Sequence, residues 1–265
     1  MIVQRNGRDA TAADLAPLAF AAYAHFTAAQ VRDGRIRGLD LHLDRLRAGS
    51  QELFGRALPD DVVRGHLRTA LAAGPADVSL TATVYSSPPA TARSADDDAP
   101  LDVLVRTGPP ATPPAGPLAL AVVPYERYLP AVKHVGEVAK THVLKVAARD
   151  GFDDAAFADR HGRLTEASIW NLAFWDGDAV VWPVGDVLGG ITMGILRRRL
   201  TGLGVPQRDA EVRPADLPAL AGAVVMNSWT PGVPVGRIGA TPLPAAPDLV
   251  AALHDAYAAE PLTAP

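Results

Sequence analysis

Cysteine is absent from this chain of 265 residues. Its absence excludes disulfide bonds, thiolate metal sites and a cysteine nucleophile. The chain also lacks a region of concentrated positive charge. Its net charge of -4 is spread along the sequence, so no basic stripe is present to bind nucleic acid or a membrane surface. Long apolar runs are missing as well, since prolines and charges interrupt every stretch that approaches the ~20 residues of a membrane-spanning helix. With 48% apolar residues, the sequence indicates a globular protein that acts on small molecules, without a nucleic-acid or membrane partner.

One apolar stretch, residues 15–24, follows Arg5 and Arg8 and superficially matches a secretory signal peptide. Asp14 is unusual in a positively charged leader, and Pro17 interrupts the apolar run. We therefore interpret the protein as neither secreted nor embedded in a membrane, and we expect a cytoplasmic enzyme.

A proline-rich segment divides the chain. Residues 108–117 read Gly-Pro-Pro-Ala-Thr-Pro-Pro-Ala-Gly-Pro, where fixed proline torsions and missing amide donors forbid a helix or a central strand. The segment predicts an interdomain linker, with a small N-terminal α/β domain over residues 1–107 and a larger C-terminal domain over 118–265. The predicted fold class is α+β, a mixed α/β architecture in two domains.

Apolar periodicity and turn residues predict the elements within each part. Helices are expected over 39–54, 61–73, 138–149 and 192–200 and from residue 248 onward. Strands are expected over 24–31, 78–85, 101–106, 118–124, 155–159, 172–175, 179–182 and 223–226. The turn Asp176-Gly177 predicts a hairpin between two of these strands. A solvated acidic loop is predicted at 96–98, and a Pro/Gly-rich loop is predicted to run through Gly239.

Familiar catalytic and nucleotide-binding signatures are missing: G-x-G-x-x-G after a strand, G-K-[ST], G-x-S-x-G and H-E-x-x-H. The seven histidines do not fall at the spacings of metal ligands. No metal site is therefore predicted.

Several dispersed residues could bind a ligand or take part in catalysis. Gly189 to Thr192 reads Gly-Gly-Ile-Thr before a predicted helix, and the free N–H groups of a glycine-led helix start form an anion site. Arg45 could grip a phosphate, and Lys133 lies in an apolar setting that favours a neutral, nucleophilic amine if it is buried. Taken alone, the helix start is equally an ordinary cap, and Arg45, Lys133 and Glu166 are ordinary surface residues.

The order of these features resembles one family. His-Leu-Asp-Arg-Leu ending at residue 46 comes first, then a lysine after a strand and Pro-x-x, then a long motif from Gly151 to Asn171, then Gly-Gly-Ile-Thr. This order resembles the fold-type IV pyridoxal-phosphate enzymes (class IV aminotransferases), which include branched-chain aminotransferase, D-amino acid aminotransferase and aminodeoxychorismate lyase. The resemblance runs from about residue 20 to 235 and is most specific over 151–192. It implies a small N-terminal α/β sandwich and a larger, barrel-like C-terminal domain.

The resemblance also implies roles for two residues. Lys133 would hold pyridoxal 5'-phosphate as a Schiff base and then shuttle a proton, whereas Lys140 and Lys145 fall in the following helix and match less well. Glu166 would pair with the pyridine nitrogen and keep the ring protonated, which makes the cofactor an electron sink.

Further residues are assigned to the cofactor in the same way. Arg45 corresponds to the arginine that grips the phosphate, and Ile191 and Thr192 to the backbone-amide and hydroxyl contacts at the helix start. Ser228 stands in the second phosphate loop. Asn171 closes the glutamate motif and is expected to act through local hydrogen bonds.

Departures from the family pattern lie around the substrate. Val138 stands in the region where branched-chain enzymes carry a tyrosine, Thr27 replaces the glutamate of Val-Phe-Glu, and the strand around Tyr85 lacks the carboxylate-binding arginine of the D-amino acid enzymes. Three hypotheses follow. The first is an aminotransferase that uses an amino donor and a 2-oxo acid, the second is a lyase of the aminodeoxychorismate type, and the third is a non-catalytic protein that retains the fold. The family implies a homodimer.

Overall fold

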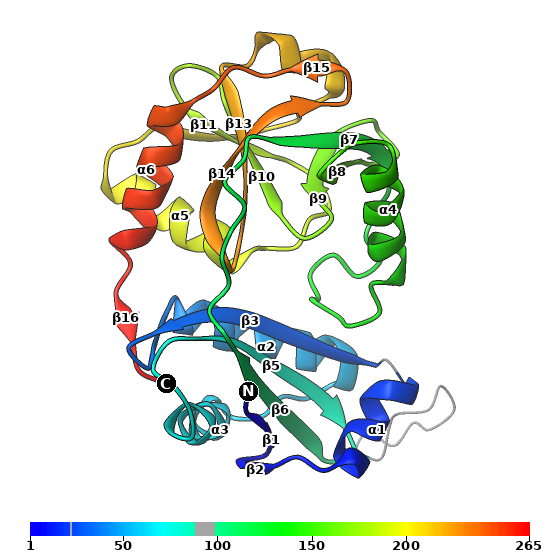
Figure 1. Ribbon diagram of the computed structural model, residues 1–265, viewed down its shortest axis with the longest axis vertical. Coiled ribbons are helices and arrows are strands. Elements are labelled where there is room, and N and C mark those ends of the chain that lie inside the picture. Colours follow the sequence, from blue (N-terminus) through cyan, green and yellow to red (C-terminus); the bar gives the residue numbers. More distant parts are fainter. Residues whose placement is uncertain (22, 88–98) are drawn as a thin grey trace. The chain divides into compact units, whose positions relative to one another are not determined.

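The computed structural model describes residues 1–21, 23–87 and 99–265 (Figure 1). The predicted acidic loop at 96–98 lies outside these ranges. The chain folds into two compact units. Unit 1 contains residues 1–111, 132–136 and 261–265, and unit 2 contains 112–131 and 137–260. Each unit is described by itself.

Unit 1 is built on a sheet of seven described strands in the order β16-β4-β3-β5-β6-β1-β2, all paired antiparallel. The strands are β1 (Val3–Arg5), β2 (Arg8–Asp9), β3 (Ala24–Arg32), β4 (Arg35–Arg37), β5 (Val78–Ser86), β6 (Leu101–Gly108) and β16 (Leu262–Thr263). Apolar side chains alternate along the central strands, so that one face of the sheet is buried.

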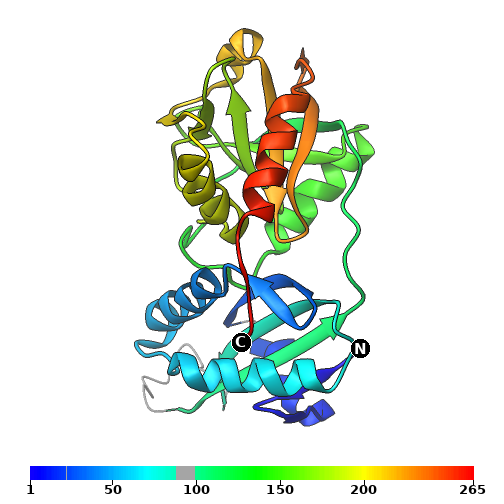
Figure 2. The same ribbon diagram turned by 90° about the vertical axis from the view of Figure 1, so that its left-hand side faces the viewer.

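Two helices cover that face, as Figure 2 shows. Helix α2 (Leu39–Phe54) buries its leucine stripe against the sheet, and α3 (Asp60–Ala72) adds Val63 and Leu67 to the same core. Gly55 ends α2 in the left-handed region, with φ 69°, which a residue with a side chain rarely adopts. The predicted helix over 39–54 is confirmed, and that over 61–73 is displaced by one residue.

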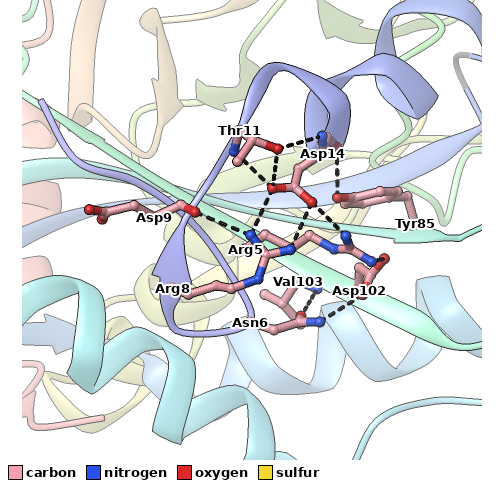
Figure 3. A network of polar contacts seen from close by, with 9 residues as sticks. All are labelled: Arg5, Asn6, Arg8, Asp9, Thr11, Asp14, Tyr85, Asp102 and Val103. Carbon is pink, nitrogen blue, oxygen red and sulfur yellow. Dashed lines mark hydrogen bonds and ion pairs between the residues drawn. The ribbon is translucent and has the colours of Figure 1, made fainter.

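The start of the chain is fastened by a polar network around Asp14 on helix α1 (Ala12–Ala21), drawn in Figure 3. The buried Asp14 carboxylate accepts hydrogen bonds from Arg5 at 2.5 Å and from Arg8 and the Thr11 hydroxyl at 2.8 Å. Asp102 of β6 holds the other end of Arg5 at 2.7 Å. The bonds from Arg8, then from the Thr11 backbone and Arg5, hold the pKa of Asp14 well below its usual range. The network thus ties β1, β2, α1 and β6 together.

Unit 2 contains a sheet that closes on itself. Its order is β12-β11-β10-β13-β14-β7-β8-β9, and β9 pairs with β10, so that β10, β13, β14, β7, β8 and β9 form a ring. The strands are β7 (Leu118–Pro124), β8 (Asp154–Ala158), β9 (Leu164–Ala167), β10 (Asn171–Trp175), β11 (Val180–Pro183), β12 (Gln207–Ala210), β13 (Gly222–Asn227), β14 (Thr230–Ile238) and β15 (Thr241–Pro242). This arrangement confirms the predicted mixed α/β fold with a barrel-like C-terminal part.

Helices pack outside the ring. Helix α4 (Val138–Arg149) covers β7 and β8. Helices α5 (Ile191–Gly202) and α6 (Pro247–Ala258) lie side by side, with α5 against β13 and β14 and α6 against β14 (Figures 1 and 2). A short 3-10 helix, Pro214–Ala219, joins β12 to β13. The ring encloses a separate apolar core that includes Leu120, Leu172 and Val225.

One expectation about unit 2 needs correction. The predicted Pro/Gly loop through Gly239 is wrong, because residues 230–238 form the long strand β14. The alternative that Glu166 is an ordinary surface residue is excluded, since Glu166 is buried on strand β9. The hairpin at Asp176-Gly177 is confirmed by the antiparallel pair of β10 and β11.

Within the described ranges, no helix combines the length and the apolar character needed to cross a bilayer.

Candidate functional site

Lys133 lies in unit 1, where its segment adds to the free edge of β3. The Phe26 N–H donates to the Lys133 carbonyl at 2.8 Å, and the Val135 N–H donates to the Ala24 carbonyl at 3.0 Å. His25 and His134 form the antiparallel bridge between these two bonds. The lysine backbone is therefore fixed as part of the sheet.

The Lys133 side chain is half-buried and lies over an aromatic ring. Its Nζ is 4.9 Å from the centroid of the Phe26 ring. Thr27, the next residue of β3, bonds to His42 of α2, so Phe26 points to the opposite, more exposed face of the sheet. The amine is thus presented on the face that α2 and α3 leave uncovered.

Arg45 follows His42 on α2 and is half-buried. The His42 Nδ1 lies 2.6 Å from the Thr27 hydroxyl. Burial, followed by the nearby Arg45 charge, lowers the pKa of His42 to about 3, so this ring is neutral at physiological pH. Thr27 and His42 together fix the turn of α2 that carries Arg45.

Glu166 is the centre of a buried ionic cluster in unit 2. Its Oε1 accepts from Arg127 Nε at 3.0 Å and from Lys140 Nζ at 3.1 Å. Arg127 also donates through Nη1 to Glu137 at 2.7 Å. Glu166, Lys140 and Arg127 are only 4%, 6% and 8% exposed. The sequence predicts the glutamate but not its two cationic partners.

Lys140 is held on the inner side of α4. It shares that side with Val143 and Ala147, three and seven residues further on, and its Nζ lies 5.6 Å from the Phe157 ring centroid. Burial lowers the pKa of Lys140, and the charge of Glu166 opposes this effect. The spacing of Lys140, Val143 and Ala147 at i, i+3 and i+7 is the sequence signal that could have predicted a buried lysine.

A loop connects Glu166 to the start of α5. The Leu188 N–H donates to Glu166 Oε2 at 3.4 Å, and the Asn171 amide donates to the Leu188 carbonyl at 2.8 Å. Gly190 lies against Asn171 so closely that an added Cβ would meet its Oδ1 at 1.8 Å. Only glycine fits here, which explains the second glycine of Gly-Gly-Ile-Thr.

Helix α5 begins at Ile191 without a side-chain cap. The first N–H groups of a helix lack carbonyl partners within it, and here Ile191 and Thr192 are buried, so an anion is the natural acceptor. The Thr192 hydroxyl donates to the Asn227 carbonyl at 2.8 Å, which attaches the helix start to the end of β13. Ser228 follows Asn227 directly and is half-buried.

The structure thus joins several of the predicted residues within unit 2 through direct contacts or chain neighbours: Glu166, Asn171, Ile191, Thr192 and Ser228. Lys133 and Arg45 belong to unit 1. A buried carboxylate beside an uncapped helix start can bind a compact molecule with a protonated nitrogen and a phosphate. The residues of unit 2 therefore fit the ring nitrogen and the phosphate of pyridoxal phosphate.

Comparison with known proteins identifies the class. The ring of unit 2 and the open sheet of unit 1 match the solved fold-type IV enzymes. The sequence profile described as Amino-transferase class IV matches residues 24–238. The chain belongs to the class IV aminotransferase family.

Three solved structures illustrate the likeness. The chain is similar to branched-chain aminotransferase from Thermoproteus uzoniensis, with 19% identity and a TM-score of 0.82 over 97% of this chain and 93% of that one. It is similar to 4-amino-4-deoxychorismate lyase from Pseudomonas aeruginosa, with 22% identity and a TM-score of 0.79 over 96% and 97%. It is also similar to a hypothetical aminotransferase from Mycobacterium tuberculosis, solved in its PLP-bound form, with 22% identity and a TM-score of 0.77 over 97% of this chain and 98% of that one. No protein with curated annotation matches the chain significantly.

Proposed function

We propose that the protein is a pyridoxal-phosphate-dependent aminotransferase in which Lys133 binds the cofactor covalently. Glu166 pairs with the ring nitrogen. Arg45, Ser228 and the N–H groups of Ile191 and Thr192 hold the phosphate, while Asn171 shapes the loop between ring and phosphate. When bound, the cofactor supplies an electron sink for the carbanion that forms at the substrate Cα.

The residues of the chain divide the remaining work. The Lys133 amine, once exchanged for the substrate amine, would move the proton from the substrate Cα to the cofactor C4' in the first half-reaction, and would move a proton in the reverse direction in the second. The Glu166 carboxylate keeps a proton on the ring nitrogen, and the helix start fixes the phosphate so that the ring cannot rotate away. Each task is a matter of holding a charge or moving a proton at one atom.

One observation carries the proposal: the buried Glu166 carboxylate and the uncapped start of α5 share the Leu188–Gly190 loop, which bonds to Glu166 Oε2 and to Asn171. A carboxylate and an anion site fixed to one short loop suit a ligand that carries a protonated ring nitrogen and a phosphate. An isolated surface salt bridge would not need this construction.

The first test locates the lysine. Purified protein is incubated with pyridoxal phosphate and reduced with borohydride, and peptide mass spectrometry identifies the modified residue. We expect the adduct on Lys133, and we expect Lys133→Ala to lose the visible absorption band. Lys145→Ala, which changes an exposed lysine of α4, is the control.

A cofactor adduct on Lys140 instead of Lys133 would contradict the proposal. The Lys140 amine is already in contact with Glu166, so an adduct on Lys140 that persists in Lys133→Ala would transfer the covalent role to α4. A protein that remains colourless with added cofactor would instead support the non-catalytic hypothesis.

Lyase chemistry is the second candidate, because one of the similar structures is a 4-amino-4-deoxychorismate lyase. The two reactions share every cofactor contact proposed above. Adding a 2-oxo acid to enzyme pre-loaded with an amino donor distinguishes them, since amino transfer supports the first and pyruvate released from aminodeoxychorismate supports the second. A homodimer and a cytoplasmic location are further proposals, which light scattering and cell fractionation would test.

A further inference from the structure

We propose that Arg127 and Lys140 are positioning residues that hold Glu166 by its Oε1 and leave Oε2 to accept a hydrogen bond from the protonated ring nitrogen of the cofactor. The inference rests on the proposed function, because it assigns a partner to Glu166. It concerns residues of unit 2 only.

Arg127 fixes the carboxylate in space. Its Nε donates to Glu166 at 3.0 Å while its Nη1 donates to Glu137 at 2.7 Å. Because the guanidinium is planar and its donors are rigidly spaced, two acceptors at two of its edges determine its orientation. The oxygen that it binds is therefore fixed as well, and Glu166 cannot rotate without breaking the contact.

Lys140 donates the second hydrogen bond to the same oxygen, Glu166 Oε1. A carboxylate oxygen accepts about two hydrogen bonds, and Arg127 and Lys140 supply both for Oε1. The bond to Oε2 comes from the Leu188 N–H and is long, at 3.4 Å. Oε2 is thus the oxygen with room for a further donor, and it lies on the side of the loop that leads to α5.

Charge separates the roles of the two cations. Glu166, Glu137, Arg127 and Lys140 sum to zero when all are ionised, and a protonated ring nitrogen adds a positive charge beside them. Arg127 cannot release its proton. Lys140 can, because burial lowers the pKa of its amine, and a neutral amine still donates a hydrogen bond to Oε1. Arg127 therefore sets the geometry, while Lys140 can hold Oε1 without its own charge when the ring nitrogen brings one.

A purely structural ion cluster is the competing explanation, since replacing one member of a buried pair destabilises a protein whatever its function. A readout that depends on the ring nitrogen separates the two explanations. The probes are pyridoxal 5'-phosphate and its 1-deaza analogue, which has carbon in place of the ring nitrogen. Their dissociation constants are measured by fluorescence titration with the wild type, Arg127→Gln, Lys140→Met and Glu166→Gln.

A hydrogen bond to a charged group contributes about 1.5–3 kcal/mol, which corresponds to a loss of roughly 10- to 150-fold. We expect Arg127→Gln and Lys140→Met to weaken pyridoxal phosphate by at least about 10-fold and to leave the affinity for the deaza analogue within about twofold. Lys145→Met on the same helix and Arg160→Gln, which breaks the exposed ion pair with Glu126, should change neither ligand.

Equal losses for the two ligands in either variant, or no loss in either, would overturn the proposal. If Arg127→Gln does not fold, Arg127→Lys keeps the charge but cannot bridge both carboxylates, and its loss must still be confined to pyridoxal phosphate. Glu166→Gln distinguishes the two levels of the argument. A wild type that binds neither probe, or a Glu166→Gln variant that loses affinity equally for both probes or for neither, refutes the proposed function itself.

Discussion

The close approach of Gly190 to Asn171 allows a quantitative prediction. In Gly190→Ala, the new Cβ would lie 1.8 Å from Asn171 Oδ1 and 2.9 Å from its Cγ, whereas real Cβ atoms do not approach other heavy atoms below 3.0 Å. To relieve this overlap, the Asn171 side chain must move by more than about 1 Å. The movement is costly, because β10 on one side and the hydrogen bond to the Leu188 carbonyl on the other confine this side chain.

The magnitude follows from two costs. Moving Asn171 breaks a buried amide hydrogen bond, which costs about 1–3 kcal/mol. Overpacking of a buried site adds about 1–3 kcal/mol. With a change of roughly 2–4 °C in Tm for each kcal/mol in a chain of this size, we expect the Tm of the apoprotein to fall by roughly 4–24 °C. The affinity for pyridoxal phosphate should fall too, since the same loop leads to the start of α5.

Circular dichroism melts of the wild type and the variants test the reasoning. Gly189→Ala is the matched control, since a Cβ at Gly189 meets nothing within 4 Å. Asn171→Ala removes the atom that clashes, so Gly190→Ala combined with Asn171→Ala should be no less stable than Asn171→Ala alone. Full additivity of the two losses, or a Gly190→Ala protein as stable as the wild type, would refute the steric argument.

Three further predictions concern buried charges and rings. The stability of the wild type over Asp14→Asn should be full above about pH 5 and shrink as the pH falls below about 4, because the lowered pKa of Asp14 stabilises the fold only while the unfolded carboxyl is ionised; melts at each pH measure this difference. Burial lowers the pKa of His25 from 6.5 to about 4, so the free energy of unfolding should decline by about 3 kcal/mol as the pH falls from 6.5 to 4. Urea titrations should show that His25→Gln depends less on pH in this range. Glu260 is buried and paired with two arginines of α5, so Glu260→Gln should lower the free energy of unfolding by about 1–3 kcal/mol, and an unchanged urea midpoint would contradict this.

Sequence pattern predicts the elements best where turn residues mark their ends. Gly55 ends α2 with a positive φ, and Gly151 follows α4 with a φ of 79°, and both helices have the bounds that their apolar spacing predicts. The strand β7 begins directly after the proline-rich segment, which cannot extend it backwards.

The same kind of residue misleads in β14. Its prolines and glycines resemble a loop, yet Pro231 falls at the irregularity between the pairs Val225–Val233 and Asn227–Thr230. Gly236 falls at a second irregularity, against β7. Prolines and glycines are tolerated in strands at such bulges, but where the bulges fall depends on how β14 pairs with β13 and β7, which a local pattern does not contain.

The candidate site divides in the same way. The proximity of Glu166, Asn171 and Thr192 could be predicted because the motif that contains them is nearly continuous along the chain, while their roles toward the cofactor stay predictions. Arg127 could not, since its place beside Glu166 depends on how β7, β8 and β9 pair across the ring. Lys140 carried a readable signal, because its spacing to Val143 and Ala147 places it on the buried stripe of α4.

The last strand of the sheet in unit 1 has a consequence for synthesis. Leu262 and Thr263 of β16 pair with β4, and the carbonyl of Pro265 accepts a hydrogen bond from Arg68. At the usual pace of a ribosome, these residues emerge roughly 8–30 s after residue 111. Throughout that interval the nascent chain exposes β4 as an unpaired edge, which is prone to join another chain. Its sequence, Arg35-Ile36-Arg37, places a positive charge on either side of one apolar residue, the arrangement that discourages such edge-to-edge association.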